Sequence, residues 1–159
     1  MSRIRKYAMA FDGQLLRRGF WVYVWRIQSP KGVYVYVGRT GDSSSRYAAS
    51  PFTRAGRHLD VGQNAKSNTL TRQIVRVGLN PTRCRFRMVA LGPLFPEQGA
   101  MKAHRPIRDK VAALERGVAD FLRQRRYSVL GTHGRFLSPD ARLFARLRAL
   151  VATEFPLQR

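Results

Sequence analysis

The sequence predicts a small α+β protein, in which a three-stranded antiparallel sheet is flanked by helices and a further helix is added at the C-terminus. Two patterns carry this prediction. Residues 20–28 and 33–39 alternate in side-chain character, as strands do, whereas residues 107–126 repeat their apolar positions at the period of a helix. The chain has 159 residues, of which 44% are hydrophobic. That size and composition suit one domain with a buried core.

The charge of the chain indicates its partner. It contains 30 lysines and arginines against 9 aspartates and glutamates, a formal net charge of +21. This excess indicates a polyanion, with nucleic acid as the first candidate and an anionic membrane surface as the second. No apolar run reaches the ~18 residues of a transmembrane helix, and the N-terminus lacks the apolar stretch of a secretory signal. Cys84 is the only cysteine, so no disulfide can form within one chain and we expect a cytoplasmic protein. Of the two candidate partners we expect nucleic acid, and no membrane.

The order of elements follows from turn and helix signals along the chain. Residues 1–19 are expected to form a basic N-terminal arm, residues 20–135 the main domain, and residues 136–159 a helix packed on that domain. Within the main domain we predict short helices over 52–60 and 69–78, a third strand over 83–95 and a loop over 96–106. A short strand and turn are predicted in YSVLGTHG, and Ser138 and Pro139 are predicted to cap and begin the last helix.

The first two strands are predicted to pair as a hairpin around the turn sequence SPKG. Pairing Gln28 with Val33 places Tyr23 opposite Gly38, a residue that leaves room for a large ring. One face then carries Trp21, Tyr23, Trp25, Tyr34 and Tyr36. The other face carries Phe20, Val22, Val24, Val33, Val35 and Val37. Because a buried tyrosine hydroxyl needs a partner, the tyrosines raise two interpretations, packing and chemistry.

Three further polar residues are candidates for a site. Glu115 lies roughly 70° from the centre of the apolar stripe of its helix, at the edge of the core. A charge there is costly, so Glu115 needs an arginine, a metal ion or a polar network. Arg54 and His58 share a helix face and could bind and protonate a phosphate, although simple exposure is the plainer interpretation. His104 and His133 are predicted in loops, without the spacing of a zinc site.

Taken in order, these residues resemble the GIY-YIG nuclease superfamily over residues 20–135. The first motif of the family is represented by Trp21-Val22-Tyr23 and the second by Tyr36-Val37-Gly38. As in the family, a helix with an Arg and a His follows, then a third strand and a helix with a Glu. The long loop after the second motif and the Arg-to-His spacing look more like the restriction-enzyme branch than the repair branch.

The resemblance implies a metal-dependent DNA endonuclease that hydrolyses phosphodiester bonds. In such an enzyme Glu115 holds one divalent ion, Mg²⁺ or Mn²⁺, and Arg54 binds the scissile phosphate. Tyr23 acts as general base or orients the water, and Tyr36 and His58 complete the catalytic set. A tyrosine with a pKa of about 10 is a poor base at neutral pH, unless nearby cations favour the phenolate.

The expected partner is double-stranded DNA, contacted through Arg39, Arg46 and Arg57. Cutting both strands with one site per chain favours a dimer on DNA or sequential nicking, and the oligomeric state stays open. Two departures from the family pattern bear on activity. Trp21 replaces the glycine of the first motif, and Gly131 stands where the family often has Asn, with Thr132 or His133 as substitutes nearby.

Two other functions compete with the nuclease. A non-catalytic nucleic-acid-binding protein on a degenerate fold of this kind explains the charge and the aromatic face through phosphate contacts and base stacking. A ribosome-associated basic protein fits the composition as well, but it leaves Glu115 and the spaced tyrosines unexplained.

Overall fold

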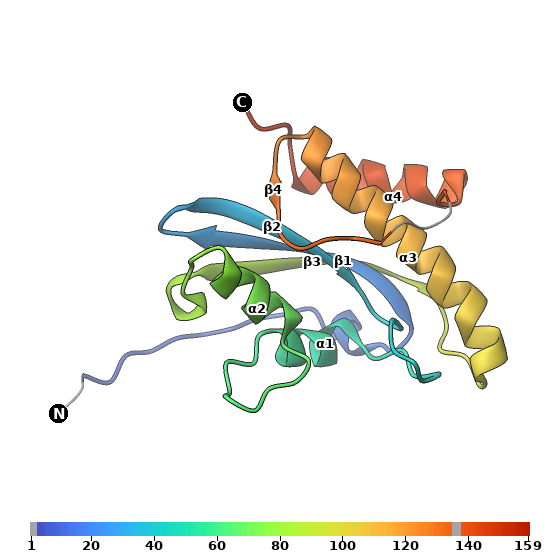
Figure 1. Ribbon diagram of the computed structural model, residues 1–159, viewed down its shortest axis with the longest axis horizontal. Coiled ribbons are helices and arrows are strands. Elements are labelled where there is room, and N and C mark those ends of the chain that lie inside the picture. The colour runs from blue at the N-terminus through green and yellow to red at the C-terminus, as the bar shows by residue number, and fades with distance from the viewer. Residues whose placement is uncertain (1–2, 135–137) are drawn as a thin grey trace.

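The computed structural model describes residues 3–134 and 138–159, and its elements confirm the α+β class (Figure 1). The strands are β1 (Phe20–Ser29), β2 (Gly32–Arg39), β3 (Arg85–Phe95) and β4 (Ser128–Val129). The α-helices are α1 (Pro51–His58), α2 (Thr69–Arg76), α3 (Met101–Gln124) and α4 (Ala141–Glu154). Short 3₁₀ helices lie at η1 (Gly13–Leu16) and η2 (Pro81–Arg83). Among the described helices, none combines the length and apolar character needed to cross a bilayer.

The sheet has four strands in the order β3-β1-β2-β4. β1 pairs antiparallel with both β2 and β3, as expected, but β4 adds a parallel pair with β2. The expectation of a three-stranded, purely antiparallel sheet is therefore wrong. The chain returns to the open edge of β2 after α3, where the Leu130 amide donates to the Val35 carbonyl at 2.8 Å. The short strand predicted in YSVLGTHG is confirmed as β4, but two residues are too few for a periodic pattern that would reveal the strand it pairs with.

The register of the β1–β2 hairpin is confirmed. Tyr23 pairs with Gly38, and Gln28 pairs with Val33. A Cβ atom at Gly38 would lie 2.6 Å from the Tyr23 hydroxyl, so only glycine leaves room for this ring. The position of Tyr23 over β2 therefore depends on the absence of a side chain at its cross-strand neighbour.

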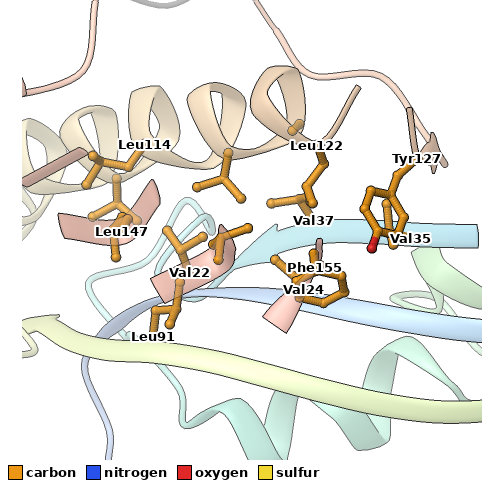
Figure 2. Packing of buried hydrophobic residues seen from close by; sticks show 14 of the residues in the cluster. Val22, Val24, Val35, Val37, Leu91, Leu114, Leu122, Tyr127, Leu147 and Phe155 are labelled. Atoms are coloured by element: carbon orange, nitrogen blue, oxygen red, sulfur yellow. The ribbon is translucent and has the colours of Figure 1, made fainter. Parts of the chain in front are cut away.

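The two faces of the hairpin form two separate cores, with α3 and α4 on one side of the sheet and α1 and α2 on the other (Figure 1). The valine-face core joins the sheet to α3 and α4 (Figure 2) and contains Phe20, Val22, Val24, Val35, Val37, Leu91, Leu114, Leu122, Leu147 and Phe155. The tyrosine-face core joins the sheet to α2 and contains Tyr23, Trp25, Ile27, Tyr36, Leu70, Ile74, Leu79 and Leu130.

Helix α3 begins earlier than the sequence predicts, so the loop expected over 96–106 is wrong in its second half. His104 lies in the first turns of the helix, fully buried, with its Nε2 atom 3.0 Å from the Gly41 carbonyl oxygen and its ring 5.0 Å from that of Phe20. Pro106 lies inside the helix, where it removes one backbone hydrogen bond. Tertiary contacts of His104 therefore outweigh the local preference of the segment before proline.

The last helix begins at Ala141, and its cap is Asp140 rather than Ser138. The Asp140 carboxylate accepts a hydrogen bond from the Leu143 amide at 2.7 Å. A carboxylate at the cap also interacts favourably with the helix dipole, which explains the choice over a serine two residues earlier. The boundary expected between residues 135 and 136 lies outside the described residues.

Candidate functional site

The structure brings together the five residues expected to be catalytic. Tyr23 comes from β1, Tyr36 from β2, Arg54 and His58 from α1, and Glu115 from α3. The His58 ring stands edge-on to both phenols, with centroids 6.1 Å from Tyr23 and 5.8 Å from Tyr36. The charge of Arg54 acts on both phenols, and that of Glu115 acts on Tyr36. The hairpin and two helices that follow it in the sequence therefore converge on one cluster.

Helix α1 owes its position to its first turn. Ser50 caps the helix by accepting a hydrogen bond from the Thr53 amide at 3.2 Å, and Pro51 occupies the first helical position. Arg54 and His58 then follow one turn apart and face the sheet. Their expected exposure as a plain solvated pair does not hold, because His58 is 2% exposed.

Burial keeps both tyrosines protonated at neutral pH. It raises the pKa of Tyr23 well above its ordinary value, and the opposing charge of Arg54 does not offset this. Burial likewise raises the pKa of Tyr36 to about 12. The Tyr23 hydroxyl donates to the Arg39 carbonyl oxygen at 3.5 Å. Of the two roles that the resemblance implies for Tyr23, orienting a water through its hydroxyl therefore fits better than acting as a phenolate base.

His58 is neutral at physiological pH. Burial, together with the nearby charge of Arg54, lowers the pKa of His58 to about 4. Neither ring nitrogen has a hydrogen-bond partner among the described residues. The sequence suggested that His58 could protonate a phosphate, which a neutral imidazole cannot do. The neutral ring can instead offer one hydrogen-bond donor and one acceptor to a ligand.

Each arginine of the site forms an ion pair with a carboxylate. Arg54 pairs with Asp42, and Arg39 pairs with Glu115. The partner of Glu115 in this structure is therefore an arginine, one of the three kinds of partner predicted from its position at the edge of the core. Burial raises the pKa of Glu115 to about 7, with Arg39 acting in the opposite direction. The sequence analysis did not identify Asp42 as a site residue, because it lies in a loop, where no periodicity indicates which residues will be in contact.

A pocket of about 380 Å³ opens beside this cluster. Its lining consists of Tyr36, Val37, Arg39, Thr69, Gln73, Glu115, Gly131, Thr132, His133 and Gly134. Of the five expected catalytic residues, only Tyr36 and Glu115 line it. Tyr23 and His58 are buried next to Tyr36 and are not part of the lining.

Two residues of the pocket need comment: Gln73 was missed by the sequence analysis, and His133 was considered there only as a substitute for the Asn that Gly131 replaces. Gln73 lies on α2, three residues after the buried Leu70, and that shared face was the signal for its inward direction. Its amide fills the space beside Gly131, whose Cβ position would lie 3.7 Å from it. His133 contacts the Val37 carbonyl oxygen through Nε2 at 3.2 Å, so it is fixed by β2 rather than placed in a free loop.

The pocket offers one carboxylate to a hard divalent cation. Mg²⁺ keeps several waters and is bound in proteins by one or two carboxylates together with substrate phosphates. Glu115 supplies one carboxylate in a pocket, and Arg39 is the cation that neutralises it in this structure. Among the described residues, no group of three His, Cys, Asp or Glu side chains could enclose an ion. Glu115 alone would therefore hold the metal, with substrate oxygens as the other ligands.

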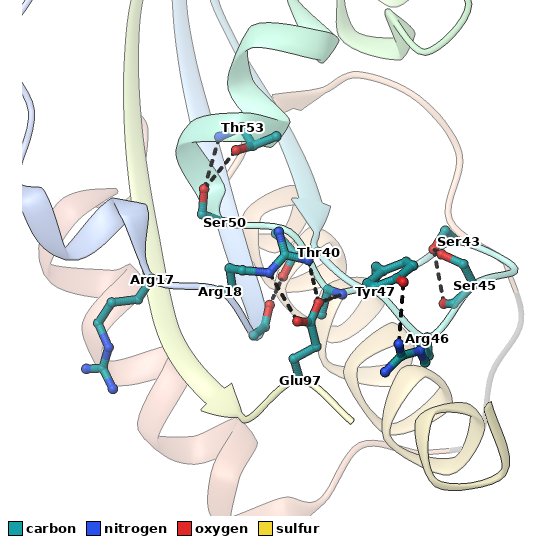
Figure 3. A network of polar contacts seen from close by, with 12 residues as sticks. Arg17, Arg18, Thr40, Ser43, Ser45, Arg46, Tyr47, Ser50, Thr53 and Glu97 are labelled. Atoms are coloured by element: carbon teal, nitrogen blue, oxygen red, sulfur yellow. Dashed lines mark hydrogen bonds and ion pairs between the residues drawn. The ribbon is translucent and has the colours of Figure 1, made fainter. Parts of the chain in front are cut away.

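The three arginines expected to contact DNA differ in their surroundings. Arg39 is half-buried in the pocket. Arg46 is exposed on the loop after β2, where it donates to the Gly99 carbonyl oxygen at 3.1 Å and to the Tyr47 hydroxyl at 3.4 Å (Figure 3). Arg57 is exposed on α1. They do not form one cluster.

The loop after β2 is held at both ends (Figure 3). At its start, the Thr40 hydroxyl donates to the Gly19 carbonyl oxygen at 2.6 Å. Near its end, the Glu97 carboxylate accepts from the Ala48 amide at 2.7 Å and from Arg18 at 2.6 Å. These anchors position the loop that carries Asp42 and Arg46.

Comparison with protein-family models, with curated proteins and with solved structures gives no match to this chain. The resemblance to the GIY-YIG superfamily therefore rests on the residues and their geometry alone, and so does any function inferred from them.

Proposed function

We propose that this protein is a metal-dependent DNA endonuclease with a GIY-YIG-like fold. One observation carries the proposal: two tyrosines, an arginine, a histidine and a glutamate from four elements converge at one end of the hairpin. A core built only for stability has no use for this set, because each buried polar group costs free energy unless it is partnered. Perturbed pKa values in such a cluster are typical of functional sites.

Each residue has a role that its surroundings support. Arg54 binds the scissile phosphate after exchanging Asp42 for the phosphate oxygens, since both are anionic partners of the same guanidinium. Tyr23 orients the attacking water through its protonated hydroxyl, and Tyr36 offers a second hydroxyl at the pocket wall. His58 remains neutral and supplies a hydrogen bond.

Glu115 would hold the divalent ion, which supplies charge neutralisation on the phosphoryl oxygens and a more acidic water. In this proposal Glu115 would exchange Arg39 for the ion. The released guanidinium stays in the same pocket and can contact the phosphate that enters with the metal. The Arg39–Glu115 pair therefore represents the metal-free form of the site in this proposal.

One observation favours the second candidate, a non-catalytic nucleic-acid-binding protein. Both guanidinium groups of the site are already paired with carboxylates, so the site is electrostatically complete without a metal or a phosphate. A binding protein would use the remaining exposed arginines and has no need to break either pair.

The decisive experiment compares plasmid nicking with and without Mg²⁺ for the parent, Glu115→Gln and Glu154→Gln. Glu154 is the matched control because it is half-buried on α4 and pairs with Arg87 on β3, away from the pocket. We expect the parent and Glu154→Gln to nick only with Mg²⁺ or Mn²⁺, and Glu115→Gln to bind DNA but not nick it. Nicking by Glu115→Gln at the parental rate would remove Glu115 as the metal ligand. Tight DNA binding by a parent that never nicks would support the second candidate instead.

A further inference from the structure

The segment that precedes η1, residues 3–11, is exposed along its whole length. We refer to it as the lead segment. Its sequence is RIRKYAMAF, which contains three cations and no acidic residue. Large apolar side chains are equally exposed, Ile4 at 97%, Tyr7 at 83% and Met9 at 78%. Single exposed apolar side chains are common, but several close together, set among charged residues, are typical of a surface that contacts a partner.

The lead segment has no regular structure, and its cations have no partner among the described residues. It runs as an extended trace from η1 to an end well outside the body of the molecule (Figure 1). Phe11 attaches its base to the protein by packing on Phe52 of α1, with ring centroids 4.5 Å apart. The helix that receives it is the one that carries Arg54 and His58. The segment is therefore anchored beside the proposed phosphate-binding helix.

We propose that the lead segment binds the minor groove of duplex DNA next to the cleavage site. This inference rests on the proposed function for the identity of the partner, and adds a second contact surface to it. Extended arms with Arg or Lys enter the minor groove, and apolar side chains such as Ile and Met are the wedges that minor-groove proteins insert between bases. Arg3, Arg5, Ile4 and Met9 supply both kinds of group.

The reach of the described residues can be compared with the groove. Nine extended residues span about 30 Å at most, close to the ~34 Å of one turn of duplex DNA. A segment anchored at Phe11 can thus follow the groove for most of a turn away from α1. The positive charge of the segment then lies along a line of phosphates on each side of the groove.

Two other occupants fit the observations less well. A second copy of the chain has a formal net charge of +21 and would therefore repel the three cations of the lead segment. An anionic membrane favours a helix at its surface, because unpaired backbone groups of an extended segment are costly in lipid. DNA avoids both penalties, since it is anionic and leaves the backbone in contact with water.

The test measures the salt dependence of binding to a DNA duplex of about 30 base pairs. The full-length variant Arg3→Ala/Arg5→Ala is compared with Arg142→Ala/Arg146→Ala, which removes the same charge from the exposed face of α4 on the other side of the sheet. Loss of two phosphate contacts should reduce the slope of log K against log salt by about 1.8 for the first variant. The slope of the second variant should stay at the parental value.

A third variant tests the apolar contacts. Ile4→Ser/Met9→Ser should weaken DNA binding by about tenfold without changing the slope, because it removes apolar burial and no charge. A minor-groove ligand such as netropsin, bound first to the duplex, should abolish the difference between the parent and the arginine variant.

Several outcomes would overturn the inference. Equal slope losses in the two arginine variants would mean that only the total charge matters. An unchanged slope in the first variant, together with a change in sedimentation, would assign the segment to a second copy. An unchanged slope with lost binding to vesicles rich in phosphatidylserine would assign it to a membrane. These results are independent of the nicking assay, so a failed nuclease proposal and a failed lead-segment proposal are distinguishable.

Discussion

The valine-face core and the tyrosine-face core lie on opposite sides of one hairpin and differ in how their polar atoms are treated. In the first, the hydroxyl of Tyr127 donates to the Pro156 carbonyl oxygen at 2.9 Å. Beside it, Nδ1 of His104 has no partner among the described residues, and beside the second core the same holds for both ring nitrogens of His58 and for the indole nitrogen of Trp25. Each such buried group costs about 1–3 kcal/mol of stability.

The difference indicates that the two faces serve different purposes. The valine face consists of aliphatic and aromatic side chains that are buried against α3 and α4, which is the composition of a stabilising core. The tyrosine face is adjacent to the charged groups of Arg54, Asp42 and Glu115. Functional sites are commonly less stable than the rest of a protein, because their polar groups are arranged for a ligand.

The largest expected effect is a loss of stability caused by a substitution in the valine-face core. Phe155 is fully buried there and stacks edge-on with Tyr127, with ring centroids 5.7 Å apart. Phe155→Ala should lower the free energy of unfolding by about 3–5 kcal/mol, because it leaves a cavity between the sheet and the end of α4. Denaturant unfolding measures the loss. The nicking rate of the molecules that remain folded should stay parental, and a specific loss of rate would show that the two faces are coupled.

Tyr23→Phe tests the opposite face. It removes one oxygen and keeps the ring over Gly38, so the hairpin should remain folded. Losing the hydroxyl that orients the water should lower the single-turnover cleavage rate by about 10²-fold, which corresponds to roughly 2.7 kcal/mol. DNA affinity and melting temperature are measured in parallel. Parental cleavage by this variant would mean that the tyrosines serve packing alone.

His58, beside the tyrosine-face core, should make the stability of the protein depend on pH. The pKa of His58 is lowered in the folded protein to about 4, so the unfolded chain binds the proton more tightly. The stability due to the neutral ring is therefore complete above pH ~6.5 and is lost as the pH falls through 4. His58→Leu should remove this dependence, and at pH ~4.5 the variant should recover about 2.5 kcal/mol relative to the parent. Parallel pH profiles for the two proteins would contradict the buried, neutral state.

The smallest expected effect is that of Tyr34→Phe. Tyr34 is half-buried on β2, pairs with Ile27 and Ser128, and packs on the tyrosine-face core outside the cluster. Its cleavage rate should stay within about twofold of the parent, and its free energy of unfolding within about 0.5 kcal/mol. A loss equal to that of Tyr23→Phe would mean that phenols on this face are interchangeable, and that no single hydroxyl is placed for chemistry.

Much of the fold follows from local rules that the sequence expresses directly. Strand alternation and a four-residue turn were enough to place Tyr23 opposite Gly38, and the helical period placed Glu115 at the edge of the core. The convergence of Arg54, His58 and the tyrosines came from their order in the resemblance rather than from any physical pattern. The start of α3 was missed, because the contacts of His104 with Gly41 are made across 63 residues.

The sequence by itself determined the class of the fold, the hairpin register and the two faces, because periods of two and 3.6 residues are properties of neighbouring residues. Only the tertiary structure decided that Glu115 pairs with Arg39, that Arg54 pairs with Asp42, and that Gln73 enters the pocket. With 30 basic side chains available, many arginines could have neutralised either carboxylate. The choice depends on distances set by the packing of α1 and α3 on the sheet, and no local rule contains them.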